Sequence, residues 1–253
     1  MPHFETVLIT GASSGLGHAI ALELAKRGTR KFALLARRVE PMQALAERLG
    51  EFGATAEVVG VDVTDYERLQ ACIRELDTAL GGFDLVLANS GVGGTGLSHE
   101  MDFETLKRTI DVNVLGAVAT LHAAADGMVA RDRGTLAGMS SLASRRGFAG
   151  SGTYSASKAA LSTWLDTLRG DLHDTNVKVT DIRPGFVRTP MTDQNDFKMP
   201  FLLELEPAAR RCVDDLERGK AVCTFPAPLS GLLWCFHRLP DWMWRLLAPL
   251  LRR

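Results

Sequence analysis

Residues that mark metal centres and disulfide-stabilised secreted proteins are few in this sequence. It has four cysteines, none of them in a CxxC pair, and six histidines without zinc-ligand spacing. No metal site is therefore expected, and the cysteines are expected to be reduced thiols in a cytosolic protein. These residues are Cys72, Cys212, Cys223, Cys235, His3, His18, His99, His122, His173 and His237.

An excess of charge of one sign is also missing. Lysine and arginine number 29 against 30 acidic residues, a net charge of −1, which argues against nucleic acid as a partner. The N-terminus has no basic segment followed by a long apolar stretch, so no signal peptide is expected and the expected location is the cytoplasm. With 46% hydrophobic residues, the chain can build one sizeable core, and we expect a single domain over residues 1–253.

What the sequence does contain is a regular alternation of two apolar patterns. Short β-branched and aliphatic runs predict strands at Thr6–Thr10, Lys31–Ala36, Ala56–Val61, Leu85–Asn89, Thr135–Met139, Val177–Ile182 and Val222–Phe225. Helical spacing predicts helices at Gly15–Arg27, Met42–Phe52, Asp65–Leu80 (after Thr64 as N-cap), Phe103–Ala130 and Gly152–His173. The alternation predicts an α/β fold, a doubly wound and mostly parallel sheet of about seven strands with helices on both faces. Ligands of such sheets bind beyond the carboxyl ends of the strands.

A glycine-rich turn follows the first predicted strand. Gly11, Gly15 and Gly17 have the spacing GxxxGxG, which permits a tight turn and a close approach to a phosphate at the start of the next helix. The alternative is a strand–helix turn without a ligand. A second stretch, GVGGTG at 91–96, also matches GxGxxG, with Asp111 twenty residues on. Because it follows the fourth strand and leads into no immediate amphipathic helix, we interpret it as a flexible loop. It would lie on the side of the nicotinamide if the glycine-rich turn binds a nicotinamide dinucleotide.

The end of the second predicted strand indicates which dinucleotide is bound. An NAD site would place Asp or Glu near this point to bind the ribose 2′-hydroxyl. Here Arg37 and Arg38 follow the strand, and no acid occurs before Glu40. Two guanidinium groups suit a 2′-phosphate, so the sequence predicts NADP(H), with NAD(H) less favoured. The alternative is a solvated basic loop.

One of the two tyrosines of the chain stands four residues before a lysine in the stretch TYSASKAAL. On a helix, Tyr154 and Lys158 share a face. The pKa of a free tyrosine is about 10, and a neighbouring cation lowers it, which suits proton transfer to a carbonyl oxygen. Ser141, thirteen residues before Tyr154 at the end of the fifth strand, can orient that oxygen. Taken singly, each residue also fits an ordinary structural role.

These motifs, in this order, resemble those of the short-chain dehydrogenase/reductase family. The resemblance extends from Thr6 to about Thr189 and rests on TGASSGLG at 10–17, Asp62, NSG at 89–91, Asn113, Ser141, YSASK at 154–158 and RPG at 183–185. Ser90 stands where the family usually has alanine, a change of little size.

The resemblance implies a Rossmann-like domain that binds one NAD(P)(H). It implies a catalytic group of Asn113, Ser141, Tyr154 and Lys158, in which Asn113 binds a water linked to Lys158. The implied cofactor-binding residues are Gly11, Ser13, Ser14, Gly15, Leu16, Gly17, Arg37, Arg38, Asp62, Val63, Asn89, Gly91, Tyr154, Lys158, Pro184, Gly185, Val187 and Thr189. Of these, Asp62 would hold the adenine amino group and Pro184 to Thr189 the nicotinamide carboxamide. Family members often dimerise, so a homodimer or homotetramer is expected through the small-residue run Ala117–Ala125 and the YSASK helix; the alternative is that this run is intrachain core.

Two C-terminal segments carry further expectations. Residues 186–220 are expected to form a substrate lid, whose Phe and Met side chains favour an apolar substrate unless they only pack the lid onto the domain. The tail Pro226–Arg253 holds three of the four tryptophans and a net charge of +3, with Pro240 and Pro249 interrupting it. It predicts two short amphipathic helices that contact either a membrane surface, a second subunit or the active-site lid.

Together these features predict an NADP(H)-dependent oxidoreductase that interconverts a carbonyl and an alcohol. The alternative is a non-catalytic NADP-binding sensor or scaffold on the same fold. An epimerase or dehydratase also uses a Tyr-x-x-x-Lys pair but would normally carry a longer C-terminal substrate domain.

Overall fold

The seven predicted strands form one sheet in a computed structural model that describes residues 4–94 and 96–248. The order across the sheet is β3-β2-β1-β4-β5-β6-β7, and every neighbouring pair is parallel. The strands are β1 (Thr6–Thr10), β2 (Lys31–Ala36), β3 (Thr55–Gly60), β4 (Leu85–Ala88), β5 (Gly134–Met139), β6 (Val177–Pro184) and β7 (Val222–Phe225). The predicted α/β, doubly wound fold is confirmed. The strand order reverses between β1 and β4, which is where such sheets bind ligands.

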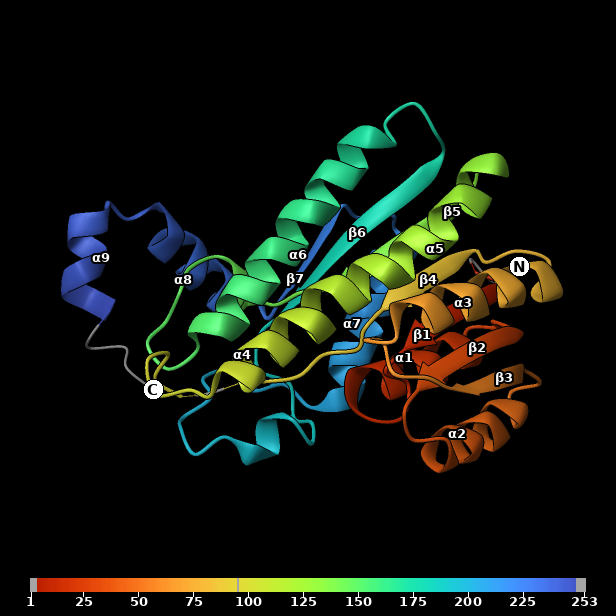
Figure 1. The fold of residues 1–253 in the computed structure, drawn as a ribbon, viewed down its shortest axis with the longest axis horizontal. Coiled ribbons are helices and arrows are strands. Elements are labelled where there is room, and N and C mark those ends of the chain that lie inside the picture. The colour runs from red at the N-terminus through yellow and green to blue at the C-terminus, as the bar shows by residue number, and fades with distance from the viewer. Residues whose placement is uncertain (1–3, 95, 249–253) are drawn as a thin grey trace.

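Helices cover both faces of the sheet (Figure 1). α1, α2 and α7 pack on one face, and α3, α5 and α6 pack on the other. The helices are α1 (Gly15–Lys26), α2 (Glu40–Gly50), α3 (Tyr66–Leu80), α4 (Phe103–Ile110), α5 (Ala117–Ala130), α6 (Gly152–Asp171), α7 (Leu205–Glu217), α8 (Ala227–Arg238) and α9 (Asp241–Leu247).

The sheet separates two apolar cores, because successive side chains of a strand point to opposite faces. On β1, Val7 and Ile9 join the core under α1 and α7, whereas Leu8 joins the core under α3, α5 and α6. All three side chains are fully buried. A strand buried on both faces favours apolar side chains at successive positions, which explains the aliphatic run Val7–Ile9 in the middle of β1.

The start of α3 differs from the prediction. Thr64 does not cap the helix; the N-cap is Asp65, whose carboxylate accepts a hydrogen bond from the backbone N–H of Arg68 (3.3 Å). The hydroxyl of Thr64 instead donates to the carboxylate of Asp62 (3.0 Å). Both residues are capable caps, and the backbone path after β3 decided between them.

The predicted helix Phe103–Ala130 is not one regular α-helix. A π-helical segment, Asp111–Gly116, separates α4 from α5. By length and composition the whole stretch could cross a membrane, but 56% of its most apolar window is buried inside the protein. This stretch belongs largely to the core. Most of the run Ala117–Ala125 is buried within this chain, in agreement with the alternative that it is intrachain core.

The segments after β6 divide differently from the expected lid at 186–220. Its second half is α7, which packs on α1 and contributes buried side chains to the core. Only the part before α7, with a short 3₁₀ turn at Thr192–Gln194, lies near the carboxyl ends of the strands. The tail forms two short helices as predicted, α8 and α9, which lie at one end of the molecule (Figure 1). Pro249, Arg252 and Arg253 lie outside the described residues, as does His3.

Candidate active site

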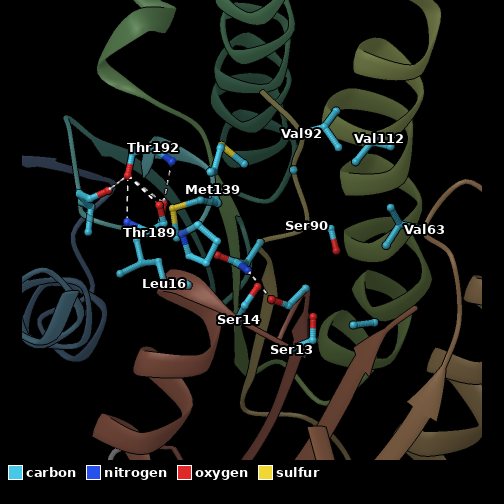
Figure 2. Close-up of a pocket in the computed structure, with 18 of the residues that line it drawn as sticks. Ser13, Ser14, Leu16, Val63, Ser90, Val92, Val112, Met139, Thr189 and Thr192 are labelled. Atoms are coloured by element: carbon cyan, nitrogen blue, oxygen red, sulfur yellow. Dashed lines mark hydrogen bonds between the residues drawn. The ribbon is translucent and has the colours of Figure 1, made fainter. Parts of the chain in front are cut away.

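A cavity of about 330 Å³ lies at the carboxyl ends of the strands. Most of the predicted site residues line it, and Figure 2 shows how side chains from separate elements converge there. The predicted lining residues are Gly11, Ser13, Ser14, Gly15, Leu16, Arg37, Arg38, Asp62, Val63, Asn89, Gly91, Tyr154, Lys158, Pro184, Gly185, Val187 and Thr189. Gly17, Asn113 and Ser141 do not line this cavity; they lie behind or beside it.

The glycine turn after β1 has the conformation that its residues require. Gly11 has a positive φ of 70°, and a Cβ on it would lie 2.9 Å from the Cα of Ser90. Gly17 leaves room for the amide of Asn89, which donates to the carbonyl oxygens of Thr10 (3.1 Å) and Gly11 (3.2 Å). The side chain of Ser14, the N-cap residue of α1, makes no capping hydrogen bond. The unpaired N–H groups and positive dipole end of α1 therefore suit a phosphate group.

The two arginines after β2 lie at the same cavity. Nη2 of Arg38 donates to the hydroxyls of Ser13 (3.2 Å) and Ser14 (3.0 Å), beside the glycine turn. Nη1 of Arg37 lies 3.9 Å from a carboxylate oxygen of Asp62; the arginine is exposed and the aspartate is half-buried. Arg37 and Arg38 are thus two solvated cations next to the predicted phosphate site, and the carboxylate of Asp62 lies beside Arg37.

Lys158 is the most unusual charged group of the site, because its side chain is almost fully buried. Its Nζ donates to the carbonyl oxygen of Met139 (2.7 Å) at the end of β5. It also lies 5.8 Å from the ring centroid of Tyr154, one turn earlier on α6. Burial lowers the pKa of Lys158 to about 8, and the carboxylate of Asp181 on β6 partly opposes this effect. The lysine therefore exchanges its proton near neutral pH.

Asn113 lies in the π-helical segment and is completely buried. Its amide nitrogen donates to the carbonyl oxygen of Val92 (3.0 Å) and to Oγ of Ser157 (3.0 Å), while its oxygen accepts from the N–H of Val92 (2.8 Å). Ser157 in turn donates to the carbonyl oxygen of Tyr154 (2.7 Å). Asn113 thereby ties the loop after β4 to the helix of the tyrosine.

Gly91 brings Asn113 and Lys158 to the same small space. A Cβ on Gly91 would lie 3.4 Å from Oδ1 of Asn113 and 3.4 Å from Nζ of Lys158. Because a carboxamide oxygen has two lone pairs, and Val92 uses one, Asn113 retains an acceptor on this side.

Ser141 begins the 3₁₀ turn Leu142–Ser144 that follows β5. Its Oγ accepts from the N–H of Ala143 (3.1 Å) and lies 3.5 Å from the carbonyl oxygen of Pro184. The neighbouring Ser140 donates to the carbonyl oxygen of Lys158 (2.9 Å) and so joins the end of β5 to α6.

Several lining residues were not predicted. Thr192 is the clearest: its hydroxyl donates to the carbonyl oxygen of Val187 (2.7 Å) and accepts from the N–H of Thr189 (2.8 Å), as the dashed lines of Figure 2 show. A hydroxyl three residues after Thr189 was the available signal. The others show little signal in the sequence, because they line the cavity through their position next to a motif: Ala36, Val61, Ser90, Val92, Val112, Met139, Ser140 and Pro190. Met191 also lines the cavity, and it is one of the methionine and phenylalanine side chains expected to form an apolar wall.

A family model for short chain dehydrogenases matches residues 5–199. The chain belongs to the short-chain dehydrogenase family. The resemblance inferred from the motifs is thereby confirmed, and the matched range includes every predicted catalytic and cofactor-binding residue.

Known relatives of this short-chain dehydrogenase are similar over most of its length. An uncharacterized oxidoreductase of Myxococcus xanthus (strain DK1622) is 48% identical over 227 residues, which are 90% of this chain and 89% of the relative. The NADP-dependent 3-hydroxy acid dehydrogenase YdfG of Salmonella typhi is 35% identical over 182 residues, 72% of each protein. A solved short-chain dehydrogenase/reductase from Burkholderia phymatum, in complex with NAD, has a TM-score of 0.84 at 22% identity, covering 96% of this chain and 94% of that one. This last likeness concerns the fold alone.

Family membership decides between the two functions considered for the motifs, an oxidoreductase and a non-catalytic sensor or scaffold. This short-chain dehydrogenase is an oxidoreductase that interconverts a carbonyl and an alcohol, and its fold binds a nicotinamide cofactor. The non-catalytic sensor or scaffold is not favoured.

Proposed function

We propose that the protein uses NADP(H) to interconvert a carbonyl and an alcohol on an apolar small-molecule substrate, with Tyr154 transferring the proton. The observation that carries this proposal is the buried Lys158. It lies one helical turn from Tyr154 in the wall of a cavity that also contains a phosphate-binding turn and two arginines. Burying a lysine is costly, and a lysine with a lowered pKa beside a tyrosine is typical of a proton-transfer site.

The roles of the residues follow from charge development at the substrate oxygen. When bound, the nicotinamide supplies or accepts the hydride. In the reductive direction the hydroxyl of Tyr154 gives its proton to the oxygen, and protonated Lys158 favours the resulting phenolate. Ser141 donates a hydrogen bond to the same oxygen. The remaining acceptor of Asn113 binds a water that returns a proton to Lys158.

NADP(H) rather than NAD(H) is the proposed cofactor. The similar proteins differ in this respect: the Salmonella typhi dehydrogenase is NADP-dependent, whereas the Burkholderia phymatum structure holds NAD. The preference therefore rests on Arg37 and Arg38, two guanidinium groups that line the cavity and that would suit a 2′-phosphate. Changing both arginines to alanine should weaken NADPH binding roughly tenfold or more and leave NADH binding unchanged. Equal weakening for both dinucleotides would contradict this role.

An apolar substrate is proposed from the segment between β6 and α7. Met191 lines the cavity, and the rings of Phe186 and Phe197 meet edge-on with centroids 6.0 Å apart. Methionine and phenylalanine form adaptable apolar walls, which favour long-chain or aromatic carbonyl compounds over charged sugars.

The function is tested by following the near-ultraviolet absorbance of NADPH. The panel would contain hexanal, decanal, an aromatic ketone, a quinone and glyceraldehyde. We expect turnover that favours the apolar compounds, and a loss of about 10²- to 10⁴-fold in kcat for Tyr154→Phe with unchanged NADPH binding. Near-wild-type turnover by Tyr154→Phe would sink the assignment of the proton donor.

The proposed location is the cytoplasm, with peripheral membrane contact through the α8–α9 hairpin (residues 227–247). Two tryptophans and a leucine of this hairpin, Trp234, Trp242 and Leu246, are exposed, and the guanidinium of Arg238 lies 4.0 Å from the ring centroid of Trp234. Exposed tryptophan, leucine and arginine together suit the interface of an anionic bilayer.

Co-sedimentation with vesicles tests this contact. The full-length protein should bind vesicles of phosphatidylcholine mixed with phosphatidylglycerol more strongly than vesicles of phosphatidylcholine alone. The double variant Trp242→Ser, Leu246→Ser should bind less in both cases. Absence of binding by the wild-type protein to either vesicle ends the membrane proposal.

Family members often assemble through the helices that correspond to α5 and α6. We propose the same for this chain, as a homodimer or homotetramer.

A further inference from the structure

The loop after Ser141 is attached to the α8–α9 hairpin by polar contacts. This loop, residues 142–150, begins with the 3₁₀ turn after Ser141 and leads to α6; it carries Arg145 and Arg146. Nδ1 of His237, in the last turn of α8, donates to the carbonyl oxygen of Arg145 (2.6 Å). Residues more than ninety positions apart are thus in direct contact beside the candidate active site.

Arg146 makes most of these contacts. Its Nη1 donates to the carbonyl oxygens of His237 (3.3 Å) and Leu239 (3.2 Å), at the C-terminus of α8, where carbonyl groups lack helical partners. Its Nη2 pairs with the carboxylate of Asp241 (2.9 Å), the first residue of α9. Its guanidinium carbon also lies 4.9 Å from a ring centroid of Trp244. One side chain therefore joins both helices of the hairpin to the loop, and it is only 16% exposed.

Apolar contacts surround this polar junction. Leu142, next to Ser141, packs in a small cluster with Leu229 and Leu233 of α8. The ring of Phe148 meets Trp244 edge-on, with centroids 5.5 Å apart. The hairpin also contacts the other side of the site: a Cβ on Gly185 would lie 2.8 Å from Cδ2 of Leu229.

The loop has little regular structure of its own to hold Ser141. The 3₁₀ turn Leu142–Ser144 has three residues, and such short turns do not persist without tertiary contacts. We propose that Arg146 is a positioning residue: by clamping the α8–α9 hairpin onto the loop, it holds Ser141 in place beside the cavity, from where its hydroxyl reaches the substrate oxygen. The clamp stands on the contacts above, and its consequence for turnover rests on the proposed function.

Hydrogen–deuterium exchange tests the clamp without any substrate. In Arg146→Ala and in Trp244→Ala, backbone amides of residues 142–150 should exchange roughly tenfold faster or more, while those of the glycine turn at 10–17 stay unchanged. Arg74→Ala is the matched control, since the side chain of Arg74 is exposed on α3, where it donates to Gln70 (3.2 Å) on the same helix. It should alter neither segment. If the loop amides exchange at the wild-type rate in both variants, the clamp is overturned.

Steady-state kinetics test the positioning role, with decanal as the substrate. Both variants should lose about tenfold or more in kcat, with NADPH binding unchanged and a smaller effect on KM, because misorientation affects the transition state more than cofactor binding. The double variant should be no worse than the poorer single variant, since either change releases the same junction between the hairpin and the loop. Arg146→Lys, which keeps the charge but not the planar fork, should recover part of kcat.

The two ideas fail in different ways. Additive losses in the double variant, or equal losses in Arg74→Ala, would overturn the positioning role. If the wild-type protein reduces nothing in the panel, the proposed function fails, and the exchange data still decide whether Arg146 clamps the loop.

Discussion

At the scale of single residues, the burial of the Lys158 side chain is energetically costly, and its contacts compensate for that cost only in part. Lys158 is buried with a hydrogen bond to the carbonyl oxygen of Met139, and burial lowers its pKa to about 8. Asp181 raises this pKa, but its carboxylate is itself paired with Arg183: Nε donates to one carboxylate oxygen (2.7 Å), and Nη2 lies 2.7 Å from the same oxygen. A lysine that remains partly uncompensated indicates a functional rather than a stabilising role.

The pH dependence of stability should report this burial. In the folded protein Lys158 loses its proton near pH 8, whereas in the unfolded chain it keeps it until about pH 10.5. Between these values the unfolded state binds more protons, so the free energy of unfolding rises with pH. Relative to Lys158→Met, the cofactor-free wild type should gain roughly 2 kcal/mol between about pH 7.5 and 9.5. Urea titrations of both proteins measure this difference, and a difference independent of pH would show that the lysine titrates normally.

At the scale of elements, the site depends on a turn whose backbone conformation favours glycine. The turn between β1 and α1 needs a positive φ at Gly11 and also has no room for a side chain there. The conformation places the N-terminus of α1 at the cavity, so that the same glycine serves the fold and the predicted phosphate site.

Gly11→Ala should therefore damage both stability and binding. A left-handed conformation costs a non-glycine residue about 1–2 kcal/mol, and the contact with Ser90 adds to this. We expect a lower urea midpoint and a clear loss of NADPH affinity by fluorescence titration. Gly50→Ala is the control, because nothing lies within 4 Å of a Cβ at Gly50; it should leave both quantities nearly unchanged. Equal behaviour of the two variants would contradict this account of the turn.

At the scale of the whole molecule, most of the exposed large apolar side chains lie in two regions. One is the α8–α9 hairpin, and the other is the stretch from α4 to α5 with Phe103, Leu115 and Val129. The first region suits the proposed membrane contact, and the second suits the proposed contact between subunits.

The subunit contact can be tested with a matched pair of variants. Leu115 and Leu232 are almost equally exposed, at 45% and 46%, but lie in different regions. Light scattering should give a dimer or tetramer for the wild type and for Leu232→Arg, and a monomer for Leu115→Arg, because a charge in a subunit interface is costly. A wild-type mass equal to one chain of 27.5 kDa would rule out the proposed assembly.

What the sequence by itself determined is the part of the protein set by short-range patterns. Strands such as Thr6–Thr10 and Val222–Phe225 were predicted to the residue, because short runs rich in β-branched and aliphatic side chains are typical of strands. The glycine turn and the Tyr154–Lys158 pair are equally local, since backbone freedom and helical spacing depend on a few neighbouring residues.

Only the tertiary structure decided the features that depend on distant residues. Asn113 lies in a π-helical segment that no periodicity showed, and its amide finds its partners at Val92 and Ser157. Half of the expected lid became α7 in the core, because it meets the apolar face of α1. The tail was predicted as two helices but not placed: Arg146 and Leu142 hold it beside Ser141. Contacts of this kind join residues far apart in the chain, so they exist only once the sheet has brought its strand ends together.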